Sequence, residues 1–128
     1  MWEQDSASKA AGLELVSVQP GSAQVKLLVE QRHANGHGIC HGGYTFTLAD
    51  TAFAFACNSY NQFAVAQHNT ITYLKAASIG DELTATAQEV YRASRSGVYD
   101  VTVTDQSTEI VAVFRGHCRT IRGQFFTE

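Results

Sequence analysis

The stretch 35–43 and the carboxylate of Asp50 are the features of the sequence best suited to chemistry. The stretch reads Asn-Gly-His-Gly-Ile-Cys-His-Gly-Gly, and an apolar segment containing Asp50 follows it. Hydrolysis at a carbonyl carbon needs a base or nucleophile beside that carbon and a donor for the developing oxyanion. Asp50 can serve as the first. Free N–H groups at a helix start can serve as the second, and Gly42 and Gly43 allow a ligand close to that backbone.

Asp50 lies among apolar neighbours in a segment that we expect to form a buried helix. A carboxylate in such a place is poorly hydrated unless it is paired, so its pKa should rise. The sequence shows no partner for it. The alternative is that Asp50 is a structural residue, hydrogen-bonded within the core or to a loop.

Four residues around this stretch, His33, His37, Cys40 and His41, have side chains that bind zinc. They lack a second ligand pair at finger spacing, and no His-Glu-x-x-His sequence occurs, so we expect neither a metal nor a cofactor. Cys40 and His41 also suggest a thiol nucleophile, but a catalytic pair is normally assembled by the fold rather than from adjacent residues. We expect His41 to cap the helix or hold the loop, and a role near the reacting group is the alternative.

Other side chains of the helix have two interpretations each. Phe46 and Phe53 lie four residues before and three residues after Asp50, so they are candidates for lining an acyl pocket, although aromatic residues here are mostly core. The hydroxyl of Thr51 is either ordinary helix content or a group that holds water at the site.

The pattern of apolar residues predicts one helix between two sets of strands. A helix apolar on nearly every face is buried, and it needs a sheet wrapped around it. We therefore expect an α+β domain with a curved antiparallel sheet. The expected elements are a short helix at 6–11, strands at 13–18 and 23–30, the long helix at 44–59, strands at 64–74, 82–93, 97–103 and 108–121, and hairpin turns at 95–97 and 105–107.

Composition excludes several classes of protein. The 128 residues are expected to form one domain, residues 1–128, and the 45% of hydrophobic residues can supply a core. The nine Lys and Arg residues are scattered and the net charge is -3, which argues against nucleic-acid binding. No run has the length of a membrane span, and the polar N-terminus is not a signal peptide. Cys40, Cys57 and Cys118 fit reduced thiols, so we expect a cytoplasmic protein.

Nearly the whole chain after the first ten residues resembles the hotdog-fold acyl-CoA thioesterases, and within them the phenylacetate-degradation (PaaI-type) branch. The matching motifs are Gly42-Gly43, Leu48-Ala49-Asp50-Thr51-Ala52-Phe53, Ala56-Cys57-Asn58-Ser59 and Val113-Phe114-Arg115-Gly116. The resemblance implies a sheet around one central helix and hydrolysis of phenylacetyl-type or hydroxyphenylacetyl-type CoA thioesters. It also implies that Asp50 is the nucleophile or general base, that Gly42 gives the oxyanion N–H, and that Asn35 orients the thioester or the water.

Coenzyme A carries phosphates, so a cationic contact is expected. The basic residues of the later chain are Lys75, Arg92, Arg95, Arg119 and Arg122, and a solvated surface explains any single one of them. Arg92 and Arg95 flank a predicted hairpin turn and are the candidates for this contact.

The spacing of Gly42 and Asp50 adds a constraint on the oligomeric state. Eight residues separate them, which is about 12 Å along a helix. Groups that act on one carbonyl lie about 3 Å from their target atoms. We therefore expect two antiparallel copies of the helix, with Asp50 of one chain facing Gly42 and Asn35 of another. The resemblance implies the same arrangement, and with it dimers that pair into a tetramer.

Two other functions remain open on the same fold. A hotdog enoyl-CoA hydratase would carry an Asp/His pair on a loop with a proline, but the single proline, Pro20, is far from the loop. A non-catalytic acyl-CoA-binding protein would lack the helix carboxylate or carry a DNA-binding segment, whereas Asp50 is present and no such segment is seen.

Overall fold

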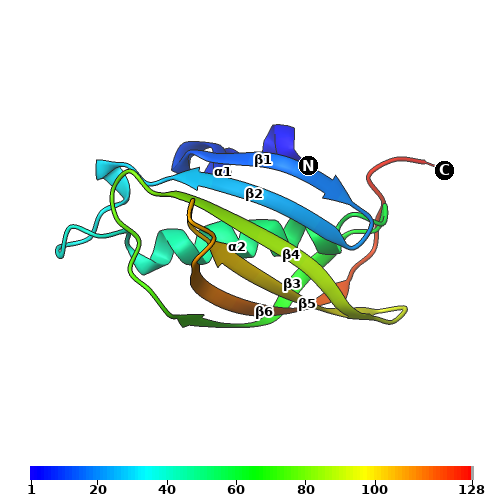
Figure 1. The fold of residues 1–128 in the computed structure, drawn as a ribbon. Coiled ribbons are helices and arrows are strands. Elements are labelled where there is room, and N and C mark those ends of the chain that lie inside the picture. The colour runs from blue at the N-terminus through cyan, green and yellow to red at the C-terminus, as the bar shows by residue number, and fades with distance from the viewer. Residues whose placement is uncertain (128) are drawn as a thin grey trace.

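A computed structural model describes residues 1–127 and has a six-stranded antiparallel sheet that curves around one long helix (Figure 1). The strand order across the sheet is β1-β2-β4-β5-β6-β3. The elements are η1 (Trp2–Gln4), α1 (Ser6–Ala11), β1 (Leu13–Gln19), β2 (Ser22–Leu28), η2 (Gln31–His33), α2 (Gly42–Cys57), β3 (Ala64–Tyr73), β4 (Glu82–Arg92), β5 (Ser96–Thr104) and β6 (Ile110–Thr120). The α+β prediction, with a sheet around a central helix, is confirmed.

Helix α2 is buried because it is apolar on most of its surface and lies in the concave face of the sheet. Its main contacts are with β2, β4 and β5. The small inward residues of β4, Ala85 and Ala87, leave room for the helix, and both are fully buried. Within residues 1–127, no helix is both long and apolar enough to span a membrane.

The predicted bounds were right to within two residues for the helices and strands, and the predicted turn at 105–107 is confirmed, whereas the turn predicted at 95–97 lies earlier in the chain. Helix α2 begins at Gly42 and ends at Cys57, rather than covering 44–59. Strand β5 already begins at Ser96, so the β4–β5 turn precedes the predicted 95–97. Strand β6 begins at Ile110, because Thr108 has a φ of 62°, which extended backbone does not allow.

Strand β3 contains a β-bulge that changes which of its side chains face the helix. The register of β3 against β6 shifts between Ala66 and His68. After the shift, Asn69 pairs with Gly116 and Tyr73 with Ala112, both of which are buried on the helix side. A one-residue shift reverses the facing of every later side chain in a strand, so the bulge turns Asn69 and Tyr73 toward α2.

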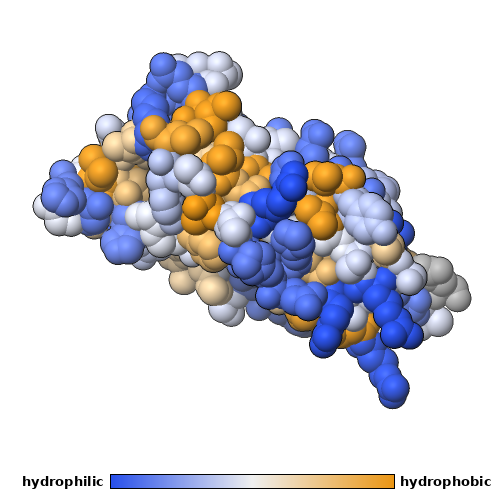
Figure 2. Space-filling view, turned by 90° about the horizontal axis from the view of Figure 1, so that it is seen from below, coloured by the Kyte–Doolittle hydropathy of each residue, from blue (hydrophilic) through white to orange (hydrophobic). Residues whose placement is uncertain are grey.

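Strand β3 is also an edge of the sheet, and most of its residues are exposed. Val65 and Tyr73 of β3, with Leu74 just after it, are large apolar side chains that remain accessible. Figure 2 looks toward this edge and shows several apolar patches among hydrophilic groups. An exposed edge with unpaired backbone groups is a natural place for strand pairing with another chain.

Candidate active site

The start of α2 offers one backbone N–H that has no acceptor within residues 1–127, that of Gly42. The N-cap residue His41 accepts the Gly43 N–H at its Nδ1 atom, at 2.9 Å, and its carbonyl oxygen accepts the Tyr44 N–H, also at 2.9 Å. The prediction that His41 caps the helix is confirmed. The Gly42 N–H therefore lies at the positive end of the helix dipole, free to bind an oxyanion.

Tyr73 covers Gly42 from β3. Its hydroxyl donates to the Gly42 carbonyl oxygen at 3.0 Å, and a Cβ placed on Gly42 would lie 3.3 Å from the tyrosine ring. Gly42 is thus held between the helix start and an aromatic ring, and there is little room for a side chain. Tyr73 was not a sequence candidate, because the strand pattern without the bulge does not turn it toward the helix.

A hollow of about 350 Å³ opens beside Gly42, and its lining includes Asn35, Cys40, Thr45, Tyr73 and Lys75. The Asn35 side chain holds its own loop: Oδ1 accepts the N–H groups of His37 at 2.9 Å and Ile39 at 3.3 Å. The Asn35 Nδ2 group donates to no residue in the described part of the chain. The structure therefore brings together two of the predicted site residues, Asn35 and Gly42.

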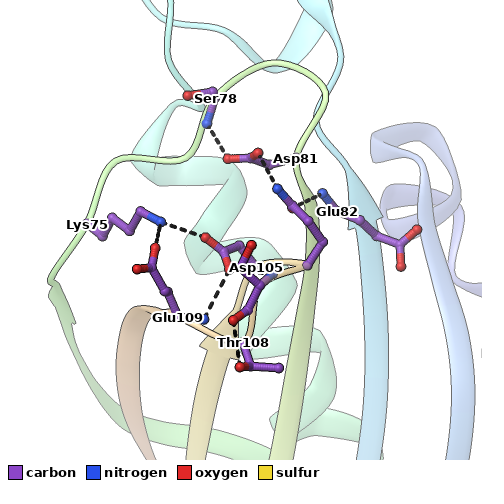
Figure 3. Close-up of polar contacts among 9 residues, drawn as sticks. Lys75, Ser78, Asp81, Glu82, Asp105, Thr108 and Glu109 are labelled. Carbon is purple, nitrogen blue, oxygen red and sulfur yellow. Dashed lines mark hydrogen bonds and ion pairs between the residues drawn. The ribbon is translucent and has the colours of Figure 1, made fainter.

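Charged residues brace one wall of this hollow (Figure 3). Lys75 lies between Asp105 and Glu109, and its Nζ is 2.7 Å from Asp105 Oδ2. The Asp105 carboxylate also accepts the backbone N–H groups of Ser107 and Glu109. This network ties the segment after β3 to the β5–β6 loop, so the charge of Lys75 is already balanced and serves to hold the wall.

Asp50 lies further along α2 and has a partner that the sequence did not reveal. Asn69 Nδ2 donates to Asp50 Oδ1 at 3.2 Å. Burial raises the pKa of the Asp50 carboxyl above its ordinary value, as predicted, and the bond from Asn69 opposes the rise in part. A half-buried carboxylate with a raised pKa is suited to accept a proton during catalysis.

Asp50 and Gly42 do not share a hollow in one chain. Asp50 is absent from the lining of the cavity beside Gly42. Both residues belong to the single helix α2, eight positions apart, so roughly 12 Å of helix separates them. The Asp50 carboxyl and the free N–H of Gly42 are thus held apart on one helix within the described chain.

Three helix residues predicted to belong to the site, Phe46, Phe53 and Thr51, make contacts with other parts of the chain. Phe53 is buried against Gly116, where a Cβ would come within 2.7 Å of its ring, so it is a core residue rather than an exposed pocket wall. Phe46 is only partly buried and packs edge-on against Phe114, with ring centroids 5.6 Å apart. The Thr51 hydroxyl lies 3.3 Å from Ser8 Oγ of α1, so its contact in this chain is structural.

Comparison with known proteins identifies the family. Residues 37–112 match the model of the thioesterase superfamily. The chain belongs to the thioesterase superfamily. It is 46% identical to the acyl-coenzyme A thioesterase PaaI of Escherichia coli strain K12, over 96% of this chain and 88% of that protein. The protein is therefore an enzyme of the thioester hydrolase class.

Solved structures agree with this assignment. The structure of the E. coli PaaI protein from the phenylacetic acid degradation operon superposes with a TM-score of 0.95 at 45% identity, covering 97% of this chain and 90% of that one. A Streptococcus mutans protein bound to acetyl-CoA has a TM-score of 0.84 at 31% identity, covering 88% of this chain and 90% of that one. The predicted hotdog fold of this thioesterase is thereby confirmed.

Two of the residues of this thioesterase that resembled zinc ligands, His33 and Cys40, are buried. The buried His33 accepts the Glu30 N–H at Nδ1, at 2.9 Å, so Nε2 carries the proton that bonds to the Ala11 carbonyl oxygen at 2.7 Å. Burial raises the pKa of the Cys40 thiol, which disfavours the thiolate that a nucleophile would need. Over residues 1–127 no group of three or more His, Cys, Asp or Glu side chains is placed to hold a metal ion.

At the other end of the thioesterase, three arginines surround a second hollow of about 540 Å³. Arg95 lies in the β4–β5 turn, whereas Arg119 and Arg122 lie at the end of β6 and just after it. The Thr120 N–H donates to the Arg95 carbonyl oxygen at 3.1 Å, which joins these two segments. No ion pair or ring contact of the three side chains occurs with any described residue. Arg92, the other predicted phosphate ligand, lies instead over the Tyr60 ring, with Cζ 3.7 Å from the centroid.

Proposed function

We propose that this thioesterase hydrolyses acyl-coenzyme A, with phenylacetyl-type or hydroxyphenylacetyl-type acyl groups, to the free acid and coenzyme A. The observation that carries the proposal is the separation of two complementary groups on one helix. Gly42 offers a free N–H at the helix start, and Asp50 offers a carboxyl with a raised pKa two turns later. The names of E. coli PaaI and the acetyl-CoA bound to the S. mutans relative support the substrate class.

In this proposal Gly42 and Asp50 act on the same thioester from two chains. The Gly42 N–H of one chain would bind the thioester oxygen and stabilise the oxyanion, with Asn35 Nδ2 orienting the thioester or the water in the same hollow. Asp50 of the partner chain would attack the carbonyl carbon or activate a water. Gly43 allows the acyl chain close to the helix start, and His41 keeps the Gly43 N–H occupied.

The exposed edge of β3 supports the shared site. Pairing of this edge with its copy across a two-fold axis would cover the apolar residues of the strand and bring two copies of α2 near each other. Two such dimers would then form the tetramer. We propose this assembly because one chain separates the two halves of its own site.

The arginine hollow supports coenzyme A as the leaving group. Arg95, Arg119 and Arg122 have no acidic partner in residues 1–127, and guanidinium groups bind phosphates with two parallel hydrogen bonds. We propose that this hollow binds phosphates of coenzyme A. Arg92 contributes less, because its guanidinium already stacks on Tyr60.

The acyl pocket is proposed at the partly buried Phe46 rather than at Phe53. Phe46 lies one turn before Asp50 and packs edge-on against Phe114. An aryl group of the substrate could extend this aromatic contact, since edge-to-face pairs are favourable.

The test is thiol release from a panel of acyl-CoA thioesters by the wild type and by Asp50→Asn. Phenylacetyl-CoA and hydroxyphenylacetyl-CoA should be the best substrates, and the variant should lose kcat by roughly 1,000-fold with KM little changed. Asp100→Asn is the matched control, because Asp100 pairs with the exposed Arg115 on β6. Equal activity of Asp50→Asn and wild type would refute the proposed role of Asp50.

A further inference from the structure

The amide of Asn69 has one half that is paired and one half that is not. Its Nδ2 group donates to Asp50 Oδ1 at 3.2 Å. A carboxylate only accepts hydrogen bonds, so this contact fixes which end of the amide faces Asp50. The Asn69 Oδ1 atom is then buried, and it accepts no hydrogen bond from the residues that the structure describes.

The inward position of Asn69, with a buried oxygen that lacks a donor within residues 1–127, needs a physical explanation. The bulge between Ala66 and His68 turns Asn69 inward, and its cross-strand neighbour is Gly116, on which the Phe53 ring packs. A buried acceptor without a donor is unfavourable in native proteins and marks a missing water or a functional role. β-bulges are also frequent next to active sites, where they aim a particular side chain.

A water molecule would supply donors to the two acceptor atoms of this pair of side chains that are left without a hydrogen bond in the described chain. Asp50 Oδ2 accepts no hydrogen bond from residues 1–127, and Asn69 Oδ1 lies on the same amide that contacts the other carboxylate oxygen. One water could donate one O–H to Asp50 and its second O–H to Asn69 Oδ1. Its lone pairs would then point away from both, toward a bound thioester.

We propose that Asn69 positions the water that attacks the thioester, so that Asp50 acts as general base and not as nucleophile. This inference rests on the proposed function and deepens it. The water oxygen forms a bond to the carbonyl carbon while Asp50 takes one water proton. The tetrahedral intermediate then collapses, the carbon–sulfur bond breaks, and the proton passes from Asp50 to the departing thiolate. The products are the free acid and coenzyme A.

The experiment compares Asn69→Leu, Asn69→Asp and the control Thr70→Val across a pH series with the best acyl-CoA substrate. Thr70 is the next residue of β3 and is exposed, so its variant tests loss of a polar group from the same strand. Asn69→Leu removes both the donor and the acceptor. Asn69→Asp keeps an acceptor for the water but removes the donor to Asp50.

We expect Asn69→Leu to lower kcat by roughly 10- to 100-fold, with KM within about twofold of wild type. The loss should persist on the high-pH plateau, where Asp50 is ionised in every variant, so a shifted pKa alone cannot explain it. Asn69→Asp should move the acid limb of the profile to higher pH and keep more of the plateau rate than Asn69→Leu. Thr70→Val should match wild type.

A second readout uses water and methanol as competing nucleophiles. Methanol has one O–H and cannot donate to both Asp50 and Asn69, so wild type should discriminate against it. Asn69→Leu should release a larger share of methyl ester relative to free acid, and a purely structural defect would leave that share unchanged. A plateau kcat of Asn69→Leu within twofold of wild type, or an unchanged ester share, overturns the inference while Asp50→Asn still tests the proposed function. No thiol release by wild type overturns both.

Discussion

Two hollows at opposite ends of the molecule contain basic residues, one beside the start of α2 and one beside the β4–β5 turn, but the charges are used differently. Beside Gly42, Lys75 is held between Asp105 and Glu109 (Figure 3). Beside the β4–β5 turn, Arg95, Arg119 and Arg122 have no acidic partner within residues 1–127. Basic side chains therefore serve two different purposes in this protein. A neutralised lysine braces the wall of a site, whereas unopposed arginines remain available for an anionic ligand.

The largest expected effect is at the end that holds Gly42. Gly42→Ala places a Cβ 3.3 Å from the Tyr73 ring, so the ring or the helix start must move. Because the Gly42 N–H is the proposed oxyanion donor, kcat should fall by roughly 100-fold. The control is Gly36→Ala, because a Cβ at Gly36 meets nothing within 4 Å. The measurement is the steady-state kcat of both variants. Similar decreases of kcat in the two would argue against the Gly42 N–H as the oxyanion donor.

Changes in the arginine hollow should affect the binding of the acyl-CoA and not the rate of the chemical step. Replacing Arg95, Arg119 and Arg122 together by Gln should raise KM for an acyl-CoA by roughly 10- to 100-fold and leave kcat nearly unchanged. The effect should shrink at high salt. A thioester of N-acetylcysteamine, which lacks the phosphates, should be hydrolysed equally by both proteins. Arg32→Gln is the control, because Arg32 already pairs with Glu30, and an equal effect there would remove the contrast between the two ends.

Lys75→Met tests whether the balanced cation is structural. Lys75 holds the pKa of the Asp105 carboxyl below its ordinary value, so the ion pair stabilises the fold above that value and loses this effect as the pH falls. The variant should therefore melt a few degrees lower at pH 7, and the difference should diminish in acid. Thermal denaturation across pH measures this, and a KM increase as large as that of the arginine variant would contradict the contrast.

The smallest effect expected is a gain in stability. Burial raises the pKa of Asp50, so between its ordinary value and the raised value the folded protein binds more protons than the unfolded chain, and stability falls as the pH increases through that range. Asp50→Asn should melt roughly one or two degrees higher than wild type at pH 7, with no difference below pH 3.8, the ordinary value. Lower stability of the variant at pH 7 would show that ionised Asp50 supports the fold.

Contacts between residues near in sequence were predictable. The start of α2, the capping role of His41 and the burial of Asp50 all follow from one short stretch and one apolar helix. Asn69 was not predictable, because strict alternation from Ala64 would turn His68 inward. The bulge reverses this order, and a single extra residue in a strand has no clear mark in the sequence.

The arginine hollow shows the same limit over a longer range. Arg95 is far in sequence from Arg119 and Arg122, and pairing of Ser96 with Arg119 brings them to one place. The sequence therefore indicated Arg95 as a phosphate ligand but paired it with Arg92, whose guanidinium the fold directs to Tyr60. The position of Arg95 beside a predicted turn identified one arginine of the hollow. Arg119 and Arg122 could be found only from the pairing of β5 with β6.

The packing of Phe53 on Gly116 constrains how this protein can vary over time. A methyl group at position 116 would come within 2.7 Å of the Phe53 ring, so alanine is disfavoured there while phenylalanine occupies position 53. A smaller residue at position 53 alone would leave an unfilled space in the core. Residues 53 and 116 are therefore expected to change together. A mutagenesis library that randomises only one of the two positions would contain few variants that fold.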